Sequence, residues 1–268
     1  MSVEATRMTR VQPSPSTVAA AKARELREGG ARILDLTVGE PDFDTPDNVK
    51  RAGIAASERG DTEYTAVNGT AALRSAIIGR LRRVTGIEYT DAEISVGSGA
   101  KHVIFTALMA TLSPGDEVVI PAPYWVSYPD MVVLNEGTPV IVACPIEDDF
   151  KLTAARLREA LTERTRLVLV CTPNNPTGTT VTDAELELFL ERVPRDVVVV
   201  IDEAYLEFVT APDAPDAVAV HRSRPNVVVL RTFSKAYGLA GLRVGYAMAH
   251  EPVALALRQA AIPFGVNS

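Results

Sequence analysis

Short, uninterrupted apolar runs rich in β-branched residues recur along the chain, and Val197–Ile201 is one example. A run without polar residues is typical of a strand that is buried on both faces, because a half-exposed strand alternates apolar and polar residues. Helical patterns separate these runs. The alternation therefore predicts an α/β fold: an open, mostly parallel sheet covered by helices on both faces, in three layers.

Turn and capping signals set the expected boundaries of these elements. We expect strands at Ile33–Thr37, Glu93–Val96, Glu117–Ile120, Pro139–Ala143, Leu167–Val170, Val197–Ile201, Val227–Leu230 and Arg243–Met248. We expect helices at Ser16–Glu28, Pro46–Ala56, Ala71–Val84, Ala100–Leu112, Tyr124–Leu134, Thr153–Leu161 and Asp183–Arg192. Residues 1–45 precede the regular alternation, so we expect them to belong to a second, smaller layer, with 46–268 forming one large domain.

Composition excludes several classes of protein. A formal net charge of −7 argues against a protein that grips nucleic acid over a broad surface. The apolar runs fall far short of the roughly 20 residues that a membrane-spanning helix needs. Two cysteines and three histidines leave little material for a disulfide scaffold or a metal centre. We therefore expect a cytoplasmic protein with no metal site, no nucleic-acid partner and no membrane segment.

Polar clusters follow the expected strands at their carboxyl ends. They are Gly97–Gly99, Asn174–Gly178, Asp202–Tyr205 and Thr232–Lys235. Open α/β sheets bind ligands outside the carboxyl ends of their strands. These clusters are therefore the first candidates for a binding site.

Lys235 is the most informative single residue, because it follows a buried-type strand directly and has small and apolar neighbours. A desolvated lysine has a lowered pKa and can form a Schiff base with a carbonyl compound. Thr232 and Ser234 place hydroxyl groups close by, and Arg243 offers a planar guanidinium that suits a phosphate group.

The pattern SKxxGLxGLRxG, at Ser234–Gly245, resembles that of the fold-type I enzymes that use pyridoxal phosphate, the aminotransferases of classes I and II. Five further motifs of that family occur in the expected order: Gly39–Pro41, Tyr64–Thr65, Pro123–Trp125, Asn174–Gly178 and Asp202–Tyr205. The front half is more similar to aspartate or prephenate aminotransferases. The back half is more similar to histidinol-phosphate or aromatic aminotransferases.

The resemblance makes the fold expectation more specific. It implies the large domain of the aspartate aminotransferase fold, with a mostly parallel seven-stranded sheet over residues 46–268. Residues 1–45 would then form an N-terminal arm and part of the small domain. Family members continue into a C-terminal segment that completes the small domain and carries the arginine for the substrate carboxylate. We find no candidate for that arginine, so we expect this segment to be missing and turnover to be weak.

The resemblance also assigns roles around the cofactor ring. Lys235 would hold pyridoxal phosphate as a Schiff base and move the proton during the reaction. Asp202 would pair with the pyridinium nitrogen, since the cofactor acts as an electron sink only while that ring is protonated. Tyr205 and Asn175 would hydrogen-bond the phenolic oxygen, and Trp125 would stack on the ring. Lys235, Asp202 and Tyr205 are the expected catalytic residues.

The remaining roles concern the phosphate and the substrate. Gly99, Ala100 and Lys101 begin a helix, where free backbone N–H groups and the helix dipole favour a phosphate. The resemblance adds Thr232, Ser234 and Arg243 to this group, together with Tyr64 from a neighbouring subunit. Gly39, Trp125 and Asn175 are the expected substrate contacts.

The leading interpretation is transamination between an amino acid and a 2-oxo acid, in a homodimer with active sites at the subunit interface. Two alternatives remain open. One is a lyase of the same fold, which would release ammonia and pyruvate without an amino acceptor. The other is a non-catalytic cofactor-binding module.

Overall fold

A computed structural model describes residues 3–267, and its centre is a seven-stranded sheet. The strands are β1 (Ile94–Gly97), β2 (Glu117–Ala122), β3 (Thr138–Ala143), β4 (Thr165–Cys171), β5 (Val198–Asp202), β6 (Val227–Thr232) and β7 (Gly245–Met248). Their order across the sheet is β1-β7-β6-β5-β4-β2-β3. Only β7 runs antiparallel to its neighbours β1 and β6, so the mostly parallel α/β sheet is confirmed.

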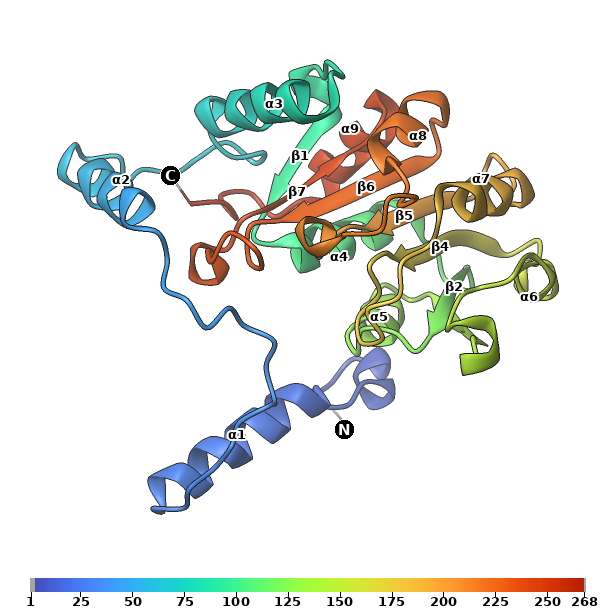
Figure 1. Ribbon diagram of the computed structural model, residues 1–268, viewed down its shortest axis with the longest axis horizontal. Helices are drawn as coiled ribbons and strands as arrows, with labels where there is room; N and C mark the ends of the chain where they lie inside the picture. The colour runs from blue at the N-terminus through green and yellow to red at the C-terminus, as the bar shows by residue number, and fades with distance from the viewer. Residues whose placement is uncertain (1–2, 268) are drawn as a thin grey trace.

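Helices cover both faces of this sheet (Figure 1). The helices of the described residues are α1 (Pro15–Glu28), α2 (Asp47–Glu58), α3 (Ala71–Thr85), α4 (Ala100–Thr111), α5 (Tyr128–Leu134), α6 (Ala154–Ala160), α7 (Asp183–Arg192), α8 (Ala217–Ser223) and α9 (Glu251–Ala260). Single 3-10 turns lie at Thr6–Arg10, Asp91–Glu93, Ile146–Asp148, Leu206–Phe208 and Ala240–Leu242. Helices α3, α6, α7 and α8 pack on one face, and α4, α5 and α9 pack on the other.

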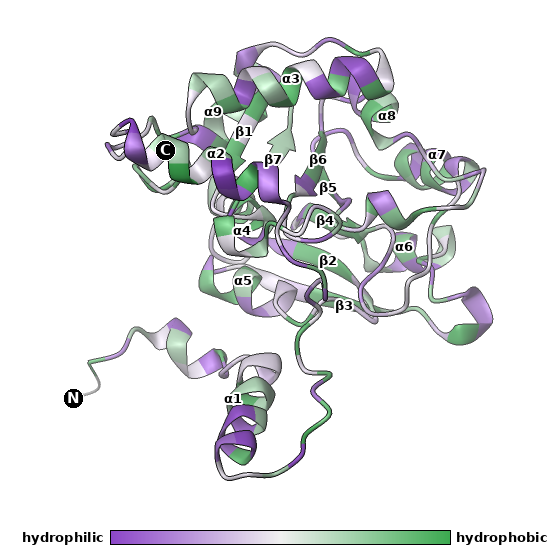
Figure 2. Cartoon of the chain, turned by 60° about the vertical axis from the view of Figure 1, so that its left-hand side comes forward, coloured by the Kyte–Doolittle hydropathy of each residue, from purple (hydrophilic) through white to green (hydrophobic). Residues whose placement is uncertain are grey.

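The central strands divide their side chains between two hydrophobic cores. In β5, Val199 and Ile201 enter the core beneath α7 and α8, whereas Val200 enters the core beneath α4. All three are fully buried. Figure 2 shows the hydrophobic residues concentrated along the strands and the hydrophilic residues on the outward surfaces of the helices. Burial on both faces explains why these strands carry unbroken apolar runs.

The N-terminal segment departs from the expected pattern. Ile33–Thr37 forms no strand, and Leu34 and Leu36 are 88% and 95% exposed. A strand needs a neighbouring strand for its backbone hydrogen bonds, and no strand of residues 3–267 pairs with this segment. Helix α1 projects from the layered body and buries only Ala23 (Figure 1).

The start of α5 also differs from the expectation. The sequence predicted a helix from Tyr124, but the helix begins at Tyr128, with Pro129 in its first turn. Proline is well tolerated there because its missing N–H has no partner within the helix. Tyr124 and Trp125 consequently lie in the loop after β2, beside the cavities described below.

A buried histidine on α8 makes the stability of the fold depend on pH. His221 has no exposed surface, its ring stacks on Tyr89, and its Nδ1 lies 2.9 Å from the carbonyl oxygen of Val227. The pKa of His221 is lowered to about 4, mainly by burial and then by the nearby His250 and Arg222, while the Val227 carbonyl and Glu93 oppose the shift. The neutral ring is therefore the form that the folded core accommodates.

We expect the free energy of unfolding to fall as the pH is lowered from about 6.5 to about 4, because His221 takes up a proton in that range only when the chain unfolds. The difference between the pKa of His221 in the unfolded chain and in the folded chain corresponds to roughly 3 kcal/mol of unfolding free energy. Urea unfolding at a series of pH values measures it. His221→Gln should remove this part of the pH dependence, and an unchanged slope in that variant would contradict the assignment.

Candidate active site

A cavity of about 380 Å³ lies at the carboxyl edge of the sheet, where the ends of several strands meet. Most of the residues singled out in the sequence line it: Gly39, Ala100, Lys101, Trp125, Asn175, Asp202, Tyr205, Thr232, Ser234, Lys235 and Arg243. Parallel strands bring their carboxyl ends to one edge, which is why residues far apart in the sequence converge here.

Asp202, the last residue of β5, is only 4% exposed. Its Oδ2 accepts a 2.7 Å hydrogen bond from the Tyr128 hydroxyl, and its Oδ1 accepts one from the backbone N–H of Ala204. Burial raises the pKa of Asp202 above its ordinary value, while these two hydrogen bonds and the positive charge of Lys235 oppose the rise. The carboxylate is thus poised beside groups that stabilise its charged form.

Lys235 lines the same cavity from the loop after β6 and is half-buried. Its Nζ donates a 2.6 Å hydrogen bond to the carbonyl oxygen of Gly39 and lies 5.6 Å from the centre of the Tyr205 ring. Burial lowers the pKa of Lys235, and the negative charges of Glu40 and Asp202 partly offset this effect. A lowered pKa increases the fraction of neutral, nucleophilic amine at neutral pH.

Aromatic and amide groups form the sides of the cavity. The Asn175 side-chain amide donates a 3.2 Å hydrogen bond to the Tyr205 hydroxyl, and burial raises the pKa of Tyr205. The Trp125 ring packs edge-on against Tyr128 at 5.5 Å, and the Lys101 amine lies over Trp125 at 4.7 Å. Asn175 and Tyr205 therefore lie side by side in the cavity, and their expected contact with a shared ligand oxygen stays a prediction.

The amino terminus of α4 and the Arg243 guanidinium face each other at one end of the cavity. Gly99 has φ +86°, and a Cβ atom there would overlap the Arg243 guanidinium. Arg243 itself has φ +57° and donates hydrogen bonds to the carbonyl oxygens of Ala240 and Ser98. Its Nη1 lies 3.5 Å from the Ser234 hydroxyl. Free N–H groups, a hydroxyl and a guanidinium together make a donor set suited to an anion.

Glu203 and Tyr64 lie outside this cavity. Glu203 points to the other side of the sheet from Asp202, is 2% exposed, and pairs with Arg231 at 2.8 Å. Tyr64 does not line the cavity; it is 84% exposed and packs against Phe264 at 4.4 Å. The geometry therefore leaves Asp202 as the carboxylate of β5 in the cavity, and it leaves the inter-subunit role of Tyr64 a prediction.

Sequence reasoning missed Tyr128 and Cys171, which both line the cavity. Tyr128 lies three residues after Trp125, in the turn that leads into α5, where its backbone N–H bonds to the Trp125 carbonyl oxygen. Burial raises the pKa of the Cys171 thiol to about 12, so it is a packing group rather than a nucleophile. Its position at the end of β4, next to Asp202 at the end of β5, was the available signal.

A second network ties the loop that carries Lys235 to the turn that carries Tyr205. The Tyr237 hydroxyl donates a 2.7 Å hydrogen bond to Glu207, and Arg80 of α3 donates to the same hydroxyl. Burial raises the pKa of Tyr237 to about 12, so it remains a neutral donor. This network fixes the two loops relative to each other from outside the cavity.

The described residues 3–267 include no helix with the length and apolar content to cross a membrane, and no cluster of three or more His, Cys, Asp or Glu side chains that could hold a metal ion.

A family model described as aminotransferase class I and II matches residues 31–268. The chain belongs to this family, and the resemblance inferred from the motifs is confirmed.

Two curated relatives carry the name aspartate/prephenate aminotransferase. The protein from Cereibacter sphaeroides is 45% identical over 246 residues, and that from Nitrosomonas europaea is 42% identical over 247 residues. Each match covers 90% of this chain and thus extends through both of its halves. The chain spans 61% and 62% of the lengths of these two relatives.

Solved structures support the same fold. The aspartate aminotransferase from Rhizobium meliloti is 37% identical with a TM-score of 0.89, and the match covers 97% of this chain and 66% of that one. The aspartate aminotransferase from Thermus thermophilus, solved with maleate, is 34% identical with a TM-score of 0.89, covering 98% and 70%.

Replacing Tyr128 with Phe should lower the free energy of unfolding by roughly 1.5–3 kcal/mol, because the buried Asp202 carboxylate loses a hydrogen bond. Denaturant titration at pH 7 measures the change. Tyr89→Phe is the matched control, since the buried Tyr89 hydroxyl has no hydrogen-bond partner among the described residues. Equal effects of the two substitutions would show that the Tyr128–Asp202 bond contributes nothing.

Proposed function

We propose that this chain carries the cofactor-binding site of a pyridoxal-phosphate-dependent aminotransferase, acting between an amino acid and a 2-oxo acid. The observation that carries the proposal is that Lys235, Asp202 and the amino terminus of α4 border one cavity. We further propose a cytoplasmic homodimer, with residues 1–45 belonging to a smaller second domain and 46–268 to the large one.

The residues present fit pyridoxal phosphate at both ends. The α4 N–H groups, Ser234 and Arg243 form a cradle for the phosphate, which a side chain at Gly99 would fill. At the ring end, Asp202 is a buried carboxylate suited to a protonated nitrogen. The Tyr205 O–H has no acceptor among the described residues and is free to donate to the ring oxygen, with Asn175 beside it.

When bound, the cofactor supplies a protonated ring that withdraws electrons from the substrate α-carbon. Asp202 holds the proton at the ring nitrogen, because the Tyr128 and Ala204 donors keep its carboxylate charged. Lys235 would hold the cofactor covalently, and its amine would carry the proton to and from the α-carbon of the substrate. Trp125 would support the ring of the cofactor.

The names of the relatives suggest the substrates. We propose aspartate as the amino donor and prephenate as one acceptor, with Gly39 contributing its backbone to the substrate carboxylate. Purified chain, given pyridoxal phosphate and then aspartate, should change its visible absorption as the amino group is transferred. If the absorption does not change when pyridoxal phosphate is added, the proposal is wrong. Release of ammonia and pyruvate without an acceptor would indicate a lyase instead.

Lys235→Ala should abolish the covalent link while leaving the phosphate cradle able to bind the cofactor. Borohydride reduction followed by peptide mapping should place a pyridoxyl label on Lys235 in the parent chain and none in the variant. Lys101→Ala is the control, since Lys101 is the other lysine of the cavity. A label on Lys101 would overturn the assignment.

Asp202→Asn should slow amino-group transfer by on the order of 10²–10⁴-fold, because an amide carries no charge to balance a protonated ring nitrogen. Stopped-flow absorption with aspartate measures this rate. Cofactor affinity should change much less, since the phosphate contacts are intact. Near-parent rates in the Asn variant would show that Asp202 has another role.

A further inference from the structure

The sheet opens between β2 and β4 toward their carboxyl ends. Backbone pairing between the two strands joins Glu117–Val119 to Thr165–Val168 and includes a register shift. Beyond that point β2 stays paired with β3 as far as Ala122, and β4 stays paired with β5 as far as Cys171. The last residues of β2 and β4 therefore separate, which leaves a crevice between them.

This crevice lies where the chain changes direction across the sheet. From β2 the chain passes through α5 on one face to the outer strand β3, whereas from β4 it passes through α7 on the other face toward β5. Strands whose connections leave in opposite directions form a topological switch point, the place where open α/β sheets bind ligands.

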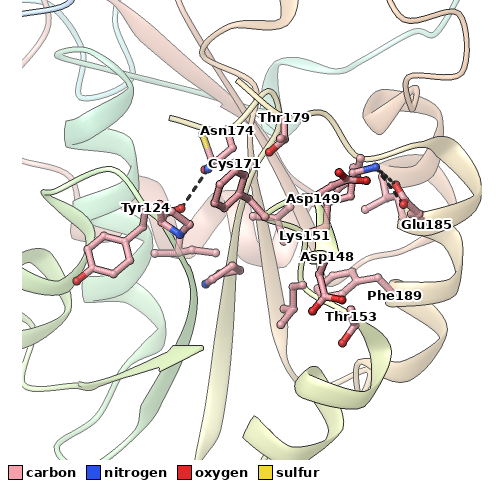
Figure 3. Close-up of a pocket in the computed structure, with 18 of the residues that line it drawn as sticks. Tyr124, Asp148, Asp149, Lys151, Thr153, Cys171, Asn174, Thr179, Glu185 and Phe189 are labelled. Atoms are coloured by element: carbon pink, nitrogen blue, oxygen red, sulfur yellow. Dashed lines mark hydrogen bonds and ion pairs between the residues drawn. The ribbon is translucent and has the colours of Figure 1, made fainter. Parts of the chain in front are cut away.

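A cavity of about 400 Å³ fills the crevice and is separate from the candidate active site, with which it shares only the wall formed by Tyr128 and Cys171. Its lining comes from both faces of the sheet: Tyr124 lies near α5, and Leu186 and Phe189 belong to α7. Figure 3 shows Tyr124 and Cys171 on one side of this space and Phe189 and the Lys151–Glu185 pair on the other. Its volume is in the range of small-molecule sites.

The floor and the rim of the crevice differ in chemistry. Ile120, Leu169, Leu186 and Phe189 make the floor apolar. On the rim, Lys151 is engaged by both carboxylate oxygens of Glu185, at 3.0 and 2.9 Å.

Rim carboxylates without a partner favour a cation. Asp148 is paired with Arg156 at 3.1 Å. Glu147 and Asp149 line the crevice, are exposed, and make no ion pair with any of residues 3–267. An incoming cation can therefore interact with these two carboxylates, and Phe150, the residue after Asp149, adds an aromatic ring to the same lining segment.

We propose that the crevice between β2 and β4 is a second binding site that takes a small hydrophobic cation, an aromatic body carrying an ammonium group. The aromatic body occupies the apolar floor, and the ammonium group lies at the rim beside Glu147 and Asp149. The proposal is independent of transamination, because Lys235, Asp202 and Tyr205 do not line the crevice.

The probe for the test is benzyltrimethylammonium, which has no N–H and cannot form a Schiff base. The protein is the full chain, loaded with pyridoxal phosphate and reduced with borohydride so that the first cavity is filled. If no cofactor binds, the unloaded chain serves equally. Ligand-observed NMR and calorimetric titration should show saturable binding of the cation, and 3-phenylpropionate, an anion of similar size, should bind at least roughly 10-fold more weakly.

Substitutions then place the site. Glu147→Gln with Asp149→Asn should weaken cation binding roughly 2- to 30-fold, the range expected for two exposed charge pairs. Asparagine suits position 149 because that residue has φ +52°, where Asn is tolerated. Glu159→Gln, an exposed carboxylate of neighbouring α6 that does not line the crevice, should leave binding unchanged.

Val181→Phe places a larger side chain in the crevice and, by itself, should also weaken binding of the cation relative to the parent chain. Absence of saturable binding would overturn the proposal, as would equal affinity for the cation and the anion. So would unchanged binding in both the charge variant and Val181→Phe, because the probe would then lie elsewhere.

Discussion

The burial of one carboxylate, that of Asp202, is the constraint around which the rest of the site is arranged. A buried charge is strongly unfavourable unless it is paired and hydrogen-bonded. Here Tyr128 and the backbone of Ala204 supply the hydrogen bonds, and Lys235 supplies the nearby positive charge. Tyr128 belongs to α5, Ala204 follows β5 and Lys235 follows β6, so the carboxylate requires these three segments to be placed correctly.

The adjacent residue shows how the sheet keeps two buried charges apart. Successive residues of a strand face opposite sides, so Asp202 and Glu203 enter different environments. Glu203 has its own cation, Arg231, from the neighbouring strand β6. Arg231 therefore neutralises Glu203 and not Asp202, and the Asp202 carboxylate remains available to a ligand in the cavity.

Much of the fold was predictable because buried parallel strands leave an unbroken apolar signal, as Val199–Ile201 illustrates. The cluster around Lys235 was predictable from its motif. Ile33–Thr37 is rich in apolar residues, although Asp35 interrupts it, but it has no strand to pair with in residues 3–267, and sequence composition does not report on pairing. Tyr128 and the opening between β2 and β4 also escaped prediction, since they depend on where a helix starts and on a register shift.

The left-handed backbone at Arg243 has a consequence for how this site can change. A non-glycine residue held at φ +57° costs on the order of 1–3 kcal/mol. Glycine would relieve that strain but would also remove the guanidinium that faces the amino terminus of α4. Selection for stability alone would therefore favour the loss of this side chain. Engineering that raises thermal tolerance here would trade it against affinity for an anion, so position 243 should be held fixed in such work.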